Sequence, residues 1–369
     1  MPTIRATSSL GAYPIHCGEG ALFRAAPLIA GLGKSTGTFI LSSPNVWRHW
    51  GRAIAKALPN GNAHRPILFD DAESSKRLAT VEGIARQLVH AGADRHAILI
   101  AVGGGVVGDV AGFTAASYLR GVRLVHIPTT VVAQVDSAIG GKTGVDLPEG
   151  KNLVGAFYPP KLVVSDPVFL RTLPGREYRS GLYEVIKYGV IADVPLFNYL
   201  ERRMDAIVRR DPTALARITA RSTAIKARIV SADERESGLR QILNFGHTLG
   251  HALETATNYR RFRHGEAVGW GMIAATLLAV ARGRLAEGDA ARIIRLVASV
   301  GPLPRLDTVR APSLRPILAS DKKSRGGRVR WVLPQRVGKM EWGIEVPWRT
   351  VARAFVELPF VAKAAETHR

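Results

Sequence analysis

The chain has 369 residues, of which 46% are hydrophobic and 22% charged, a balance typical of a globular protein and not of a disordered one. This length exceeds one ordinary hydrophobic core, so we expect two domains. The formal net charge is +21, but the basic residues are dispersed and form no run of five or more like charges. This dispersion argues against a specific nucleic-acid function and favours weak attraction of acidic metabolites.

The cysteine count and the apolar runs argue against a disulfide-bonded secreted protein and against a membrane protein. The single cysteine, Cys17, cannot form an internal disulfide, which fits a reducing, cytoplasmic location. No apolar run of signal-peptide length is found near the first residues. The longest apolar stretch, residues 267–281, is shorter than the ~18 to 20 residues of a membrane span. We therefore predict a buried core helix there and no membrane partner.

The first half of the chain alternates short apolar runs with amphipathic stretches. We predict buried strands at residues 37–41, 97–102, 123–127 and 162–164, and helices at 75–91 and 108–119. This alternation is typical of an α/β domain with a mostly parallel sheet covered by helices on both faces. We assign this domain to residues 1–174.

After Leu173 the pattern becomes helical, and residues 175–369 are predicted to form an all-α domain. Helices are expected at 176–200, 212–231, 243–257, 265–282 and 289–300, with Asp289 as the N-cap of the last. An apolar run at 329–333 is compatible with a strand or an extended segment.

A glycine-rich turn, Gly103 to Asp109, follows a predicted strand and opens a predicted helix. Glycines let the backbone approach a phosphate, and a helix N-terminus offers free N–H groups and a favourable dipole. The acidic residue that usually follows about 20 residues later in dinucleotide-binding turns is absent. The turn therefore indicates nucleotide binding of a non-standard kind, or simply a tight connection.

Glycines, lysines and acids are crowded between Gln134 and Asn152. A glycine pair before Lys142 would let its ammonium group reach a phosphate or carboxylate without steric blocking. Apolar residues on both sides predict a loop packed against a core, although an ordinary surface loop remains an alternative.

Three histidines and one glutamate suggest a metal site. His247 and His251 are spaced i, i+4 and would share one helix face, His264 opens the next helix, and Glu184 lies inside an apolar helix. A buried acid needs a cation, and two histidines with one carboxylate form a usual ligand set of catalytic zinc. Satisfied core histidines are the structural alternative.

These residues resemble the 3-dehydroquinate synthases, a branch of the sugar-phosphate cyclases. The matching blocks run from about residue 103 to 323 and read GGGVVGDVAGFTAASYLRG, IPTTVVAQVDSAIGGKTGVD, GKNLVGAFYPPKLVVSDP, GLYEVIKYGVI, ESGLRQILNFGHTLGHALE, HGEAVGWGM and SDKK. The resemblance implies a Rossmann-like NAD-binding α/β domain, a helical metal-binding domain and an active site between them.

The resemblance also implies the site residues. Zinc or cobalt would be held by Glu184, His247 and His264. NAD contacts would come from Asp71, Glu73, Lys76, Gly105, Val106, Val107, Gly108, Asp109, Thr129, Thr130, Lys142, Lys151, Phe169 and Thr172. Substrate contacts would come from Asp136, Asn152, Lys226, Asn244 and Lys322, and from Arg120 across a homodimer. Catalytic roles would fall to His251, Glu236, Lys142, Lys187 and Arg240.

The family's reaction converts 3-deoxy-arabino-heptulosonate 7-phosphate into 3-dehydroquinate and phosphate, a step of the shikimate pathway. It passes through transient oxidation, phosphate elimination, re-reduction and intramolecular aldol closure. Ser43, Tyr183 and Trp270 depart from residues common in the family. The alternatives are another cyclase, of the 2-deoxy-scyllo-inosose or valiolone type, a metal-dependent alcohol dehydrogenase of related fold, and a non-enzymatic binding protein.

Overall fold

The computed structural model describes residues 3–58, 66–320 and 329–366. By contacts within the chain it divides into two compact units. The first unit is Met1–Leu173 with Leu215–Glu234, and the second is Pro174–Ala214 with Arg235–Arg369. The predicted domain assignment of residues 175–369 therefore differs from this division in one segment, since 215–234 packs with the first unit.

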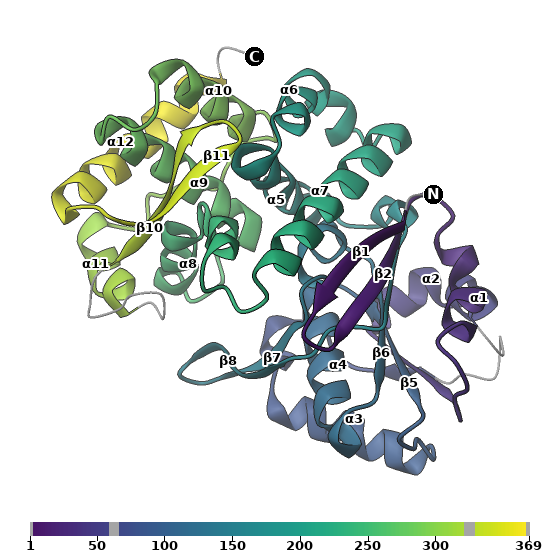
Figure 1. Cartoon of the computed structure of the whole chain (residues 1–369). Helices are drawn as coiled ribbons and strands as arrows, with labels where there is room; N and C mark the ends of the chain where they lie inside the picture. Colours follow the sequence, from purple (N-terminus) through teal and green to yellow (C-terminus); the bar gives the residue numbers. More distant parts are fainter. Residues whose placement is uncertain (1–2, 59–65, 321–328, 367–369) are drawn as a thin grey trace. The chain divides into compact units, whose positions relative to one another are not determined.

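A seven-stranded sheet forms the centre of the first unit, in the order β1-β2-β9-β6-β5-β3-β4 (Figure 1). Strands β1 and β2 pair antiparallel, and every other neighbouring pair is parallel. The strands are β1 Thr3–Ser8, β2 Gly11–Cys17, β3 Thr38–Ser42, β4 Ile67–Leu68, β5 Ile98–Gly103, β6 Arg123–Pro128 and β9 Leu162–Ser165. All four strands predicted from apolar runs are present, and each end lies within one residue of its predicted position.

Two apolar cores cover the two faces of this sheet. Because side chains alternate along a strand, Ile98, Ile100 and Val102 of β5 enter one core, while Leu99 and Ala101 enter the other. The first core is closed by α1 and α2, and the second by α3 and α4. These helices are α1 Ala25–Ala30, α2 Pro44–Ala57, α3 Leu78–His90 and α4 Gly105–Ser117. The mostly parallel, doubly covered sheet confirms the predicted α/β arrangement.

Two further elements belong to the first unit. The segment around Lys142, predicted to be a loop, is an antiparallel hairpin of β7 Lys142–Leu147 and β8 Gly150–Phe157. Helix α7, Pro212–Ala232, supplies residues 215–232 to this unit, and Ser231 Oγ accepts a hydrogen bond of 2.8 Å from the backbone N–H of Thr7. Sequence periodicity predicted the helix but could not indicate the unit with which it packs.

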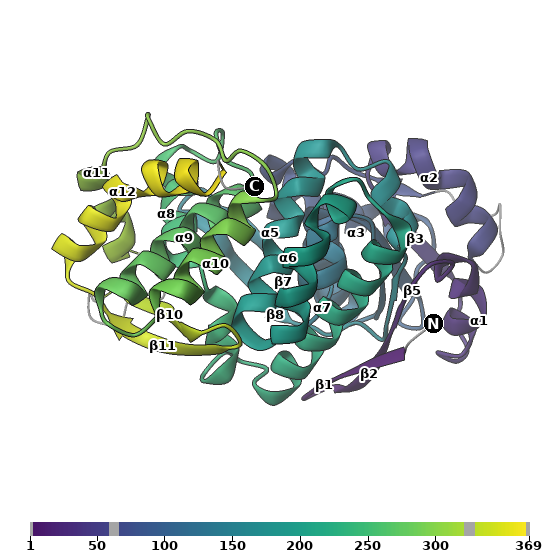
Figure 2. The ribbon, with the colours of Figure 1, turned by 90° about the horizontal axis from the view of Figure 1, so that it is seen from above.

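The second unit is built around α9, which contacts α5, α8, α10 and α12. Figure 2 shows α5, α9 and α10 side by side. Among the described residues, α9 alone is long and apolar enough by composition to cross a membrane, but 78% of it is buried, as predicted for a core helix. The helices are α5 Gly175–Ala192, α6 Val194–Val208, α8 His247–Ala256, α9 His264–Ala281, α10 Glu287–Ala298, α11 Ala311–Ser320 and α12 Trp348–Glu366.

Three predictions for the second unit were wrong in detail. The unit is not all-α, because β10 Arg330–Arg336 and β11 Lys339–Glu345 form an antiparallel hairpin. The predicted helix 176–200 is two helices, separated at Asp193, whose side chain accepts a hydrogen bond of 2.8 Å from the N–H of Leu196 and so caps α6. Asp289 lies in the first turn of α10, which Ala286 precedes as N-cap.

Candidate functional site

Three side chains converge in the second unit. Glu184 lies on α5, His247 is the first residue of α8, and His264 is the first residue of α9. Glu184 Oε1 lies 3.5 Å from His247 Nε2 and 3.4 Å from His264 Nε2. The three ligand atoms all lie within 4.8 Å of one another, so one cation could contact all of them. The predicted metal-binding residues are thus brought together.

Close helix packing explains how three separate helices meet here. A Cβ added to Gly271 would lie 1.7 Å from the carbonyl oxygen of Gly246, and one added to Gly265 would lie 1.8 Å from the carbonyl oxygen of Ser180. Only glycine permits these approaches of α9 to the start of α8 and to α5. Gly246 itself has φ of +81° and turns the chain directly into His247. The glycines therefore set the spacing of the ligands.

The outward-facing nitrogens of the two histidines have acceptors. His247 Nδ1 lies 3.1 Å from the carbonyl oxygen of Phe245, and His264 Nδ1 lies 3.3 Å from Glu254 Oε2. A carbonyl and a carboxylate can only accept, so Nδ1 carries the proton in both rings. Both Nε2 atoms are left to face Glu184. Metal-binding histidines are oriented in this way by partners of their other nitrogen.

The Glu184 carboxylate is surrounded by cationic or protonatable groups. Its side chain is fully buried, Lys187 forms an ion pair with Oε2, and the two histidines face Oε1. Burial lowers the pKa of His264, but hydrogen bonds to Glu184 and Glu254 raise that pKa to about 10. Two carboxylates thus hold a proton that a divalent cation would replace. The donor set of two imidazoles and one carboxylate fits zinc or cobalt.

Other predicted catalytic residues lie in the same unit. The ring of His251 is 5.4 Å from that of His247 and 6.1 Å from that of His264, measured between centroids. Glu236, which has φ of +61°, accepts a hydrogen bond from Asn244 Nδ2. Arg240 is buried and 2% exposed. The predicted substrate contact Lys322 lies outside the described residues.

The glycine-rich turn of the first unit connects β5 to α4. Gly104 precedes the helix, and a Cβ there would lie 3.0 Å from Thr130 Cγ2. The carbonyl oxygen of Gly103 accepts a hydrogen bond of 2.9 Å from the N–H of Thr129. The helix N-terminus therefore opens beside the Thr129–Thr130 segment. Val107 is wholly buried beneath the turn, so its side chain is not available to a ligand.

The sheet topology places this turn at a point where nucleotides commonly bind. Helix α2 after β3 and helix α4 after β5 cover opposite faces of the sheet, although β3 and β5 are neighbours. In open α/β sheets, the crevice beyond the carboxyl ends of two such strands is the usual ligand site. Ser43 lies at the end of β3, where it caps α2 by accepting a hydrogen bond of 3.3 Å from the N–H of Val46.

Ion pairs join several predicted ligand-contacting residues of the first unit. Lys76 Nζ lies 2.5 Å from Asp109 Oδ2 and also donates to Asn152 Oδ1. Burial raises the pKa of Asp109 to about 6, although the ammonium group of Lys76 opposes the shift. Lys151 pairs with Glu73 at 2.8 Å, and Lys226 pairs with Asp136. These lysines are already neutralised, so an anionic ligand would exchange with carboxylates.

Four further residues predicted to contact NAD or the substrate lie either in core or helix contacts or on the surface. Phe169 is buried in the core against Trp50, with ring centroids 4.9 Å apart, so its side chain is not available to a cofactor. Thr172 Oγ1 accepts a hydrogen bond of 2.7 Å from Trp50 Nε1. Asp71 is exposed, as is Arg120, which has φ of +64°.

Sequence reasoning missed Glu254. Its position three residues after His251 on one helix was a usable signal, since i and i+3 share a helix face. The pairing with His264 depends on how α8 and α9 pack, which the sequence pattern alone could not show.

Two family models match consecutive parts of the chain. Residues 66–180 match the model of the 3-dehydroquinate synthase N-terminal region, and residues 181–324 match that of the C-terminal region. The chain belongs to the 3-dehydroquinate synthase family. A relative of that name from Koribacter versatilis is 45% identical over 98% of this chain and 99% of its own length.

Solved structures of sister cyclases share the fold. The 2-epi-5-epi-valiolone synthase of Streptomyces hygroscopicus subsp. jinggangensis, solved with NAD⁺ and Zn²⁺ bound, is 30% identical, with a TM-score of 0.84 over 94% of this chain and 97% of its own. A 2-deoxy-scyllo-inosose synthase complexed with carbaglucose-6-phosphate, NAD⁺ and Co²⁺ is 26% identical, with a TM-score of 0.86 over 96% and 100%. These likenesses support the cyclase fold assigned to both units.

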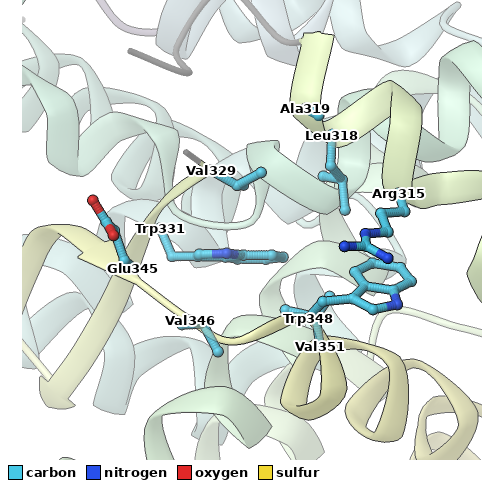
Figure 3. A pocket seen from close by; sticks show the side chains of 9 residues that line it. All are labelled: Arg315, Leu318, Ala319, Val329, Trp331, Glu345, Val346, Trp348 and Val351. Carbon is cyan, nitrogen blue, oxygen red and sulfur yellow. The ribbon is translucent and has the colours of Figure 1, made fainter. Parts of the chain in front are cut away.

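A separate pocket of about 240 Å³ lies in the second unit between α11, the β10–β11 hairpin and α12 (Figure 3). Trp331, Trp348 and Arg315 line it, with the Arg315 guanidinium 6.0 Å from the centre of the Trp348 ring. Among the described residues, none of those predicted to bind metal, NAD or substrate lines this pocket.

Proposed function

We propose that this chain is a 3-dehydroquinate synthase, which converts 3-deoxy-arabino-heptulosonate 7-phosphate into 3-dehydroquinate and phosphate. The observation that carries the proposal is the convergence of Glu184, His247 and His264 within a chain whose two halves both match this family. Curated relatives of this name are 43–47% identical over most of the chain.

The first unit is the Rossmann-like, NAD-binding part of the enzyme, and the second unit holds the metal. For the first unit, support comes from the backbone N–H groups at the start of α4, which suit a pyrophosphate. For the second, it comes from the cluster of Glu184, His247 and His264. When bound, NAD supplies a hydride acceptor regenerated within the cycle, and zinc or cobalt supplies Lewis acidity at the reacting oxygen.

In the NAD-binding part, the residues act by position and charge. The N–H groups of the turn at Gly105 to Asp109 bind phosphate, and Thr129 and Thr130 border it. Lys76 and Lys151 bring positive charge to the same region, held in place by Asp109 and Glu73. The side chain of Phe169 packs in the core and makes no cofactor contact in this proposal.

Lysines and arginines bind the substrate's phosphate and carboxylate, because charge-assisted hydrogen bonds are strong and arginine suits bidentate contacts. Arg240, Lys142 and Lys226 take these roles, with Lys322. The imidazole of His251 exchanges a proton with the substrate near the metal ligands. Glu236 orients Asn244 and is the second candidate for proton transfer.

Lys187 has a distinct role beside the metal ligands. Its ammonium group is buried, 1% exposed, and paired with Glu184. It fixes the orientation of the Glu184 carboxylate and keeps positive charge beside the substrate. The exposed Arg120 reaches the active site of a partner subunit in a homodimer, and the enzyme works in the cytoplasm.

The sister cyclases are the alternative, because solved examples share the fold at 26–30% identity. A substrate panel tests the choice. Phosphate release is measured with heptulosonate phosphate, sedoheptulose 7-phosphate and glucose 6-phosphate, each with NAD and Co²⁺. Release with heptulosonate phosphate alone is expected. Release with either neutral sugar phosphate, and none with the acid, would replace this function with that of a sister cyclase.

A further inference from the structure

We propose that Glu254 is a positioning residue for the metal, fixing the tautomer and orientation of His264 so that Nε2 faces Glu184 and His247. The inference rests on the proposed metal site and extends it to a residue outside the ligand set. Glu254 lies in the last turns of α8, its side chain is 8% exposed, and its Oε2 is 3.3 Å from His264 Nδ1.

Two overlapping groups of residues could each hold an ion, and geometry decides between them. One group is Glu184, His247 and His264, and the other is His251, Glu254 and His264. His264 belongs to both, but its two nitrogens face different carboxylates: Nε2 faces Glu184 at 3.4 Å, and Nδ1 faces Glu254 at 3.3 Å. An imidazole that binds a metal through one nitrogen donates its N–H from the other.

His247 settles which side holds the ion. Its Nδ1 is occupied by the carbonyl oxygen of Phe245 at 3.1 Å, while its Nε2 faces Glu184 Oε1 at 3.5 Å. Both Nε2 atoms therefore point to the same carboxylate, and the ion belongs there. Glu254 lies on the far side of the His264 ring and orients that ring without binding the ion.

The two histidines differ in what holds them. The acceptor for His247 is a backbone carbonyl, which a side-chain substitution leaves in place. The acceptor for His264 is a carboxylate, whose negative charge also makes the imidazole a stronger ligand. Replacing Glu254 is therefore expected to weaken the metal site through His264 and to leave His247 and Glu184 as they are.

Metal affinity of the full chain tests the inference. Glu254→Gln keeps the shape and an accepting oxygen but removes the charge. Competition for Zn²⁺ and Co²⁺ with a chromophoric chelator is expected to show a loss of about 10- to 100-fold in affinity. The absorption bands of bound Co²⁺ should keep their wild-type positions, because the ligand set is unchanged. Glu201→Gln is the control. It removes a carboxylate on α6 that pairs with Arg292 at 2.7 Å, and it should keep wild-type metal affinity.

A second variant separates charge from folding. Glu254→Asp retains the carboxylate on a side chain one methylene shorter, and is expected to bind metal more tightly than Glu254→Gln. The reverse ranking, or wild-type affinity in Glu254→Gln, would overturn the inference. A shift of the Co²⁺ bands in Glu254→Gln would do so as well, since it would make Glu254 a ligand. A wild-type protein that binds no metal would instead refute the proposed function itself.

Discussion

The two units prepare for ligands in opposite ways. The second unit gathers side chains from α5, α8 and α9 around Glu184, so the identity of each side chain matters. The first unit offers mainly backbone, at the turn between β5 and α4, where the absence of side chains matters. The histidine cluster should therefore lose metal binding when a side chain is removed. The glycine turn should lose nucleotide affinity when a side chain is added.

The two units also differ in how their charged side chains are paired. In the first unit, Lys76, Lys151 and Lys226 are each paired with a carboxylate. Around the histidines, Glu184 is paired with Lys187, and both Glu184 and Glu254 face His264. The first arrangement can exchange its carboxylates for an anionic ligand, whereas in the second two carboxylates face imidazoles that a metal ion could bind. Four substitutions test this contrast.

Removing a ligand should have the largest effect. His247→Ala is expected to lower metal-supported turnover by about 10³-fold or more, because several kcal/mol of Lewis-acid stabilisation is lost. NAD affinity should remain within about twofold of wild type, since the residue lies outside the first unit. Turnover and NAD titration are measured on the same preparation. Undiminished turnover would remove His247 from the metal site.

Asp109→Asn should change how stability depends on pH. The pKa of Asp109 is about 6 in the folded state and 3.8 ordinarily, so the folded state binds the proton more tightly. Stability from this group is therefore present at low pH and lost as pH rises from about 4 to 6. The loss is at most about 3 kcal/mol, since a fifth of the side chain stays exposed.

Denaturant unfolding without NAD at pH 4 and pH 7 measures this loss. The unfolding free energy of wild type relative to Asp109→Asn should be lower at pH 7 than at pH 4. A relative stability that rises with pH would show that Lys76 dominates and that the pKa of Asp109 is lowered.

Adding a side chain should impair the turn. In Gly105→Ala the new Cβ would lie 3.4 Å from Ser137 Oγ, a contact that a small adjustment accommodates, so the protein should fold. The methyl group would obstruct close approach of a phosphate, and NAD affinity is expected to fall on the order of tenfold. Metal affinity should not change. Calorimetric titration with NAD and with metal measures the two affinities. An unchanged NAD affinity would show that the nucleotide binds elsewhere.

The smallest effect concerns Ser43, which follows β3 and caps α2. Ser43→Ala removes the cap of α2 and should lower the unfolding free energy by about 1 kcal/mol. If capping is its whole role, NAD affinity should stay within about twofold of wild type. A larger loss of affinity would assign Ser43 a contact with the cofactor.

The sequence predicted those features that depend on local pattern. Apolar runs located β3, β5, β6 and β9, and histidine spacing with the family resemblance located the ligands. Features set by packing were not predictable in this way. The pairing of Glu254 with His264 depends on the approach of α8 to α9. Likewise, the assignment of residues 215–234 to the first unit depends on long-range contacts.

The most direct test is turnover by metal-depleted protein given NAD and heptulosonate phosphate before and after Zn²⁺ or Co²⁺ is restored. Phosphate, 3-dehydroquinate and NADH are measured together. No reaction is expected before metal is restored, and equal amounts of phosphate and 3-dehydroquinate without net NADH are expected afterwards. Accumulating NADH without phosphate release would contradict it and indicate a dehydrogenase.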